Sequence, residues 1–129
     1  MGWFSKKKTP PYEEIKRQII SGDYIASFNS IKEWTIKDPS DDYLKFLYSV
    51  YNCLSEPKGG FSRKNLRTQL ERLSENKNVE IKGKSILNLA AIRMEMGEDT
   101  NKCLEFAVEG EKLLEQNRIE FLNLKSFYL

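Results

Sequence analysis

Residues 83–115, GKSILNLAAIRMEMGEDTNKCLEFAVEGEKLLE, hold two helical patterns on either side of a glycine. The apolar residues of the first pattern stand at i, i+3 and i+4: Ile86, Leu89 and Ala90. Those of the second recur every three or four positions: Cys103, Phe106, Ala107, Gly110 and Leu114. Gly97 suits the left-handed backbone that ends a helix, and Asp99 or Thr100 suits the cap of the next. The stretch therefore predicts two amphipathic helices folded back as an αα-hairpin.

Small residues in this hairpin predict that its two helices approach closely. They are Ala90, Cys103, Ala107 and Gly110. Larger side chains at these positions would hold the two backbones apart. A single hairpin cannot bury both of its faces, so we expect further hairpins to pack against it.

The rest of the chain repeats the same plan. Helices are expected at 12–21 and 24–37 around Gly22, and at 43–54 and 63–76 around a loop that contains Gly60. The second helix carries an apolar stripe of Ile25, Phe28, Ile31 and Trp34. A short final helix within 117–129 is expected to cover the open end of the stack.

Three hairpins whose corner glycines lie 38 and 37 residues apart indicate a helical repeat. Their residues resemble the tetratricopeptide repeat family, whose unit is 34 residues long. The matching residues are Gly22-Asp23-Tyr24, Ser27 and Pro39 in the first hairpin, and Leu89-Ala90, Gly97, Cys103, Ala107 and Gly110 in the last. The resemblance implies an all-α, right-handed superhelix with an inner groove for a peptide or a partner helix. We expect a flexible basic and aromatic segment at 1–10 and one helical-repeat domain at 11–129, with an irregular helical bundle as the alternative.

Composition narrows the class of protein. Of 129 residues, 40% are hydrophobic and 12% aromatic, which argues against disorder, and a net charge of +2 is too small for a general nucleic-acid binder. The chain has no histidine, the commonest general base and metal ligand, so we expect no enzyme activity, no cofactor and no small-molecule substrate. Cys53 and Cys103 lie in apolar patterns and predict buried, reduced thiols in the cytoplasm. No stretch reaches the ~20 apolar residues that a membrane-spanning helix needs.

The resemblance also implies candidate groove residues. Some members of the family hold a C-terminal carboxylate with lysines and asparagines of the first helix of each pair. Aligning the hairpins on Leu47 and Leu89 places several polar residues at or near such positions. The predicted partner contacts are Lys45, Ser49, Asn52, Lys84 and Asn88. Lysine and amide donors hold carboxylates through charge-assisted hydrogen bonds. The ordinary explanation is that these are surface residues without a partner role.

An acidic stretch offers a second kind of partner contact. Residues 95–115 contain 7 acidic and 2 basic residues. A solvated helix face is the ordinary explanation. The specific alternative is a small inhibitor, such as an immunity protein, that uses Glu105, Glu109 and Glu111 to cover a basic toxin.

Two basic segments leave other classes of partner open. Lys58, Arg63, Lys64 and Arg67 surround a glycine-rich corner before a helix, where phosphate or an RNA backbone could bind, although the spacing is not that of a Walker loop. At the N-terminus, aromatic and basic residues predict possible contact with an anionic membrane surface: Trp3, Phe4, Lys6, Lys7 and Lys8. The preferred interpretation is a protein-binding module, with a peripheral membrane adaptor and an RNA-binding protein as alternatives.

Overall fold

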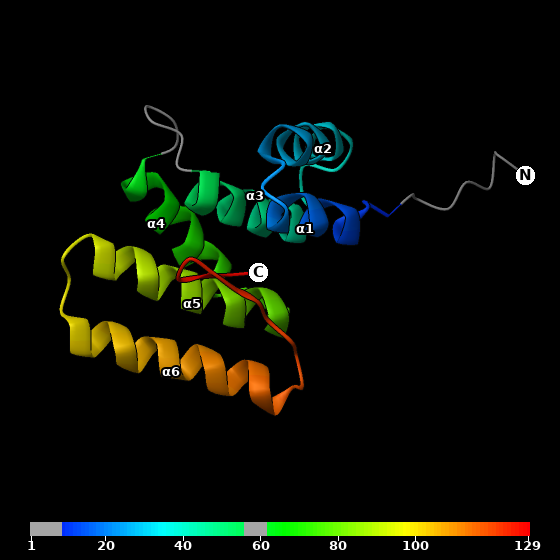
Figure 1. Ribbon diagram of the computed structural model, residues 1–129. Coiled ribbons are helices and arrows are strands. Elements are labelled where there is room, and N and C mark those ends of the chain that lie inside the picture. Colours follow the sequence, from blue (N-terminus) through cyan, green and yellow to red (C-terminus); the bar gives the residue numbers. More distant parts are fainter. Residues whose placement is uncertain (1–8, 56–61) are drawn as a thin grey trace, which may run out of the picture.

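The structure, a computed structural model, describes residues 9–55 and 62–129, where six α-helices stack in sequence order (Figure 1). The helices are α1 (Tyr12–Ile20), α2 (Tyr24–Lys37), α3 (Asp42–Ser55), α4 (Arg63–Leu73), α5 (Val79–Glu95) and α6 (Thr100–Gln116). Each helix packs against the next one along the chain, and α3 also contacts both α1 and α5. The predicted all-α class and the stack of helix pairs are confirmed.

Capping residues and glycines place the helix ends. Gly22 and Gly97 have φ of 80° and 82°, which glycine adopts without strain and other residues rarely do. The Asp23 carboxylate accepts the Ala26 N–H at 3.2 Å, and Asp99 accepts from the first turn of α6. Two boundaries differ from the prediction by more than one residue, since α4 ends at Leu73 and α5 begins at Val79. Asn78 caps α5 through its side chain, so the helix begins before Gly83.

α3 lies in the middle of the core, as its apolar sequence predicts. Eight of its 14 residues are buried, and α1, α2, α4 and α5 pack around it. One cluster of buried residues runs from α1 to the end of the chain; its largest fully buried members include Phe46, Ile15, Ile19, Leu44, Leu47, Leu66, Leu70 and Leu89. Ile25 is an exception to the predicted stripe on α2, because its side chain is 79% exposed.

Both cysteines are buried free thiols, as predicted. Burial raises the pKa of the Cys53 thiol to about 12, and the charge of Arg63 only partly opposes this shift. Because only the thiolate reacts, we expect Ellman's reagent at pH 8 to modify Cys53 about a thousandfold more slowly in the folded chain than in the unfolded one. Kinetics on a Cys103→Ala variant, with and without guanidinium, measure this ratio. Equal rates in the two solutions would contradict a buried thiol.

The final helix predicted within 117–129 is wrong. α6 ends at Gln116, Arg118 adopts a left-handed φ of 55°, and the chain then forms a two-stranded hairpin of β1 (Asn123–Leu124) and β2 (Phe127–Tyr128). Burial alternates at the end of the chain: Phe127 and Leu129 are buried and Tyr128 is half-buried. That period of two belongs to a strand. The hairpin crosses α5 and packs against α3, so a strand takes the covering role expected of a helix (Figure 1).

Candidate functional site

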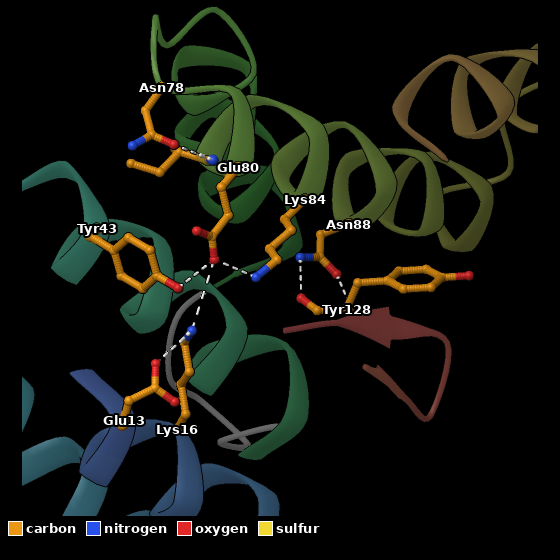
Figure 2. Close-up of polar contacts among 9 residues, drawn as sticks. Glu13, Lys16, Tyr43, Asn78, Glu80, Lys84, Asn88 and Tyr128 are labelled. Carbon is orange, nitrogen blue, oxygen red and sulfur yellow. Dashed lines mark hydrogen bonds and ion pairs between the residues drawn. The ribbon is translucent and has the colours of Figure 1, made fainter. Parts of the chain in front are cut away.

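Three polar side chains of α5, Glu80, Lys84 and Asn88, stand at i, i+4 and i+8 and therefore lie on one face of the helix (Figure 2). Glu80 is the hub. Its Oε2 atom accepts hydrogen bonds from Lys84 Nζ at 2.5 Å and from Tyr43 Oη at 2.6 Å. The ammonium group of Lys16 lies 3.8 Å from the same oxygen. The network therefore joins α1, α3 and α5 through one carboxylate.

Burial and charge act in opposite directions on this network. Burial favours the neutral form of Glu80, but hydrogen bonds from Lys84 and Tyr43 and the charges of Lys84 and Lys16 outweigh it, so the pKa of Glu80 is lowered. Burial lowers the pKa of Lys84, although its pairing with Glu80 opposes the shift. Burial and the hydrogen bond to Glu80 raise the pKa of Tyr43. The carboxylate is thus held as an anion, which suits a structural ion pair better than a proton donor.

Asn88, the third residue of the row, holds the chain's own C-terminal strand. Its Nδ2 atom donates to the Tyr128 carbonyl oxygen at 2.8 Å, and its Oδ1 atom accepts the Tyr128 N–H at 2.6 Å (Figure 2). Its side chain is fully buried beneath the strand. The predicted face of α5 is therefore a recognition face, but the segment recognised belongs to the same chain.

The other four predicted groove residues differ in how far they are buried. Ser49, Asn52 and Lys84 are almost completely buried, so the prediction that they contact a partner from the surface is wrong, whereas Asn88 is buried beneath the C-terminal strand that it holds. Ser49 and Asn52 donate to backbone carbonyl oxygens four residues earlier on α3. The face that the repeat pattern would open to a ligand is here packed into the core. Lys45 alone is exposed, and it pairs with Asp42 at 3.6 Å.

The predicted basic cluster is largely neutralised by nearby carboxylates. Arg63 pairs with Glu95 at 2.9 Å, and Arg67 pairs with Glu98 at 2.8 Å. A phosphate would have to displace both carboxylates. Lys64 is exposed, and Lys58 lies outside the described residues.

The acidic face is partly present. Glu105 and Glu109 are exposed on α6, one turn apart, and Glu111 is half-buried. Leu104 and Val108 next to them are 51% and 45% exposed, so this surface is both acidic and apolar.

The predicted membrane contacts Trp3, Phe4, Lys6, Lys7 and Lys8 lie outside the described residues and stay a prediction. None of the helices in residues 9–55 and 62–129 combines the length and the apolarity needed to cross a bilayer. Within the same residues, no three potential ligands among cysteine, aspartate and glutamate gather where they could hold a metal ion.

A surface that the sequence did not predict lies on both sides of α3. On the α2 side is an apolar cleft of about 340 Å³, lined by Phe28, Ile31, Lys32, Thr35, Ile36, Leu44, Lys45 and Tyr48. On the α4 side is a polar cleft of about 550 Å³, lined by Asp42, Lys45, Tyr48, Asn65, Thr68, Gln69, Arg72, Leu73 and Asn76. Lys45 and Tyr48 line both clefts and form the ridge between them. We call this surface the double cleft.

One residue of the double cleft, Ile36, stands apart in the sequence pattern of α2. Ile36 is 74% exposed and lines the apolar cleft, yet it falls outside the stripe expected to face the core. A single exposed isoleucine is ordinary on a protein surface, so Ile36 gains meaning only from the cleft that it lines.

Comparison with known protein families, with curated proteins and with solved structures gives no match to this chain.

Proposed function

We propose that the chain is a non-catalytic protein-binding module and that the double cleft is its docking surface. The single observation that carries the proposal is the ridge of Lys45 and Tyr48, which has an apolar cleft on one side and a polar cleft on the other. Polypeptides present apolar and polar side chains close together, so such a pair of clefts suits a protein segment.

The lining of the clefts indicates the chemistry of that segment. Phe28, Ile31 and Leu44 form an apolar wall against which an apolar side chain of the partner, the anchor, can pack, and Lys32 also lines this cleft. Among the described residues, the charged side chains that line the apolar cleft are Lys32 and Lys45, and Lys45 already pairs with Asp42 at 3.6 Å. Lys32 therefore favours a carboxylate next to the anchor. In the polar cleft, Arg72 and Asn65 can bind a further carboxylate or backbone carbonyl. The Asn76 amide already donates to Asp42, which lines the same cleft, at 2.7 Å, and the Gln69 amide donates to the Lys45 carbonyl oxygen at 3.5 Å. We therefore propose a partner segment that carries apolar and acidic residues side by side.

The proposed lack of catalysis and the proposed cytoplasmic location are supported by the composition and by the buried residues. The sequence has no histidine, and the carboxylate of Glu80 is held as an anion by its own neighbours. The two buried free thiols favour a reducing compartment and support the cytoplasm as the proposed location.

The test compares two isoleucines of α2. Ile36→Glu puts a carboxylate into the apolar cleft, whereas the control Ile25→Glu makes the same change at a residue that is 79% exposed and lines neither cleft. Burying an unpaired carboxylate against an apolar partner is expected to reduce affinity at least about tenfold. Quantitative affinity purification from source-cell lysate should therefore recover a partner with the original chain and with Ile25→Glu, and lose it with Ile36→Glu. Both variants should unfold at nearly the same denaturant concentration.

The same experiment separates the proposal from a second candidate, an inhibitor that covers a basic protein with α6. The exposed Glu105 and Glu109 favour it. A partner that Ile36→Glu retains, and that is lost when these two glutamates become glutamines, would move the docking surface to α6. If no protein depends on either change, neither surface binds a partner under those conditions and the binding-module proposal fails.

A further inference from the structure

The C-terminal strand occupies a seat between α3 and α5 that has the features of a peptide-binding site. Phe127 and Leu129 are only 5% and 3% exposed, and both belong to the core cluster. Between them, both backbone groups of Tyr128 are held by the Asn88 side chain. A side-chain amide that pairs with backbone N–H and C=O recognises an extended chain without regard to its sequence, and the two buried side chains add selectivity.

The segment in the seat has a strained backbone. Arg118 precedes the hairpin with φ of 55°, and the hairpin turn is made by Lys125 and Ser126 with φ of 54° and 78°. Glycine or asparagine normally takes these left-handed positions, and neither residue occurs at any of the three. Residues 117–122, which join α6 to β1, belong to no helix or strand. The seat is therefore filled by a strained segment on an irregular connection.

Next to the seat is an apolar cleft that the C-terminal segment leaves open. It has a volume of about 430 Å³ and is lined by Leu87, Ala90, Ala91, Met94, Glu95, Cys103, Leu104, Ala107, Asn123, Lys125, Ser126 and Tyr128. Met94 and Leu104 at its edge are 39% and 51% exposed. Asn123, Lys125, Ser126 and Tyr128 of this lining belong to the C-terminal segment itself, so the walls that remain after its displacement are those of α5 and α6. A segment that used the seat and also packed against these walls would bury the apolar surface of Met94 and Leu104 that the chain's own segment leaves exposed.

We propose that the seat between α3 and α5 is a binding site for an extended segment of another polypeptide, and that residues 123–129 occupy it as a built-in competitor. The partner segment has an aromatic residue, an aliphatic residue two positions later, and a further apolar side chain for the neighbouring cleft. This second site is independent of the double cleft.

The tether sets how strongly the chain's own segment competes with an outside segment for the seat. A short connection gives the tethered segment an effective concentration of about 1 mM, so an outside segment with the same contacts binds with an apparent Kd near that value. A large apolar side chain in the open cleft is expected to strengthen binding on the order of tenfold or more. The cleft is therefore what allows an outside segment to displace the native one.

The experiment uses the full chain and a fluorescein-labelled peptide of residues 122–129, LNLKSFYL, which keeps the two backbone hydrogen bonds between Leu122 and Leu129. A double variant, Phe127→Ser with Leu129→Ser, should release the seat. We expect fluorescence anisotropy to show that this variant binds the peptide at least about tenfold more tightly than the original chain, because the competitor is gone. Adding Asn88→Ala should weaken binding about tenfold by removing two hydrogen bonds. A peptide with serine at both apolar positions is the matched control.

A measurement on the unmodified chain keeps the test decisive if the double variant fails to fold. The amide hydrogen of Tyr128 is bonded to Asn88, so its exchange reports whether the seat is filled by the chain's own strand. An excess of unlabelled peptide extended by one leucine should speed this exchange at least about tenfold and leave α6 amides unchanged, because a peptide in the seat displaces the strand. A folded double variant that does not bind the peptide, or exchange unaffected by the extended peptide, would overturn the proposal.

Discussion

Replacing Glu80 with glutamine should lower the free energy of unfolding by about 3 kcal/mol, whereas replacing its partner Lys84 with methionine should cost less than about 1 kcal/mol. The two residues form one ion pair, yet their surroundings differ. The Lys84 side chain is 3% exposed and that of Glu80 is 28% exposed. The cost of losing a partner therefore depends on which residue is left behind.

Without the Glu80 charge, the Lys84 ammonium would stay buried beside a neutral amide. It would then have to remain charged without a salt-bridge partner, favoured only by the charge of Glu13, or give up its proton, and both options favour the unfolded chain. Without Lys84, the Glu80 carboxylate would still have the Tyr43 hydroxyl, the ammonium group of Lys16 and partial contact with water. Methionine would also keep most of the packing of the lysine stem.

Guanidinium unfolding of the two single variants and the double variant forms a double-mutant cycle. Glu80→Gln with Lys84→Met removes both charges, so the double variant should recover most of the loss seen with Glu80→Gln alone. Equal losses in the two single variants would contradict the asymmetry. Additive losses in the double variant would show that the pair is not coupled.

The lowered pKa of Glu80 also predicts how the stability of the folded chain responds to acid. Because the pKa of Glu80 is lowered in the folded chain, its contribution to stability is present above the pKa of an unfolded glutamate. That contribution is lost as the pH falls through the lower, folded pKa. Glu80→Gln should therefore flatten the acid limb of a plot of stability against pH, which urea unfolding at successive pH values measures.

Local signals in the sequence were enough to predict most of the fold. Helix caps and corner glycines act within a few residues, so Asp23, Asp99, Gly22 and Gly97 could be assigned their roles without knowledge of the tertiary structure. The final segment was different. Its apolar residues at Ile119, Leu122 and Phe127 suit a helix by spacing, but the seat on α5 supplies backbone partners to an extended chain. A contact between residues 40 positions apart decides the outcome, and no local pattern contains it.

The candidate site could be predicted only in part, for a similar reason. Helical spacing correctly grouped Lys84 and Asn88 on one face, but spacing does not reveal what covers that face. Ile25 and Ile36 show the same limit on α2, since both are isoleucines of one helix, yet Ile36 lines the double cleft and Ile25 does not. A periodic pattern defines directions around a helix axis, whereas a binding site depends on which neighbours leave one of those directions open.

Replacing Gly110 with valine should lower the free energy of unfolding by about 3 kcal/mol, at the upper end of what overpacking a core usually costs. A Cβ atom at Gly110 would lie 2.9 Å from Ile86 Cγ2 and 3.0 Å from the carbonyl oxygen of Gly83. The first contact can relax by side-chain movement, but the second is with backbone of α5. The two helices would have to separate, which would disturb packing along their length.

Lys112→Val is the matched control for this variant, because Lys112 is exposed on the same helix two residues away. Valine is a somewhat better helix former than glycine and a poorer one than lysine, so intrinsic propensity alone would make Gly110→Val the more stable of the two. We expect the opposite order in guanidinium unfolding, because close packing outweighs propensity at Gly110. If the two variants lose equal stability, the close approach of α5 and α6 at this glycine contributes nothing, and the small residues that first indicated the hairpin need another explanation.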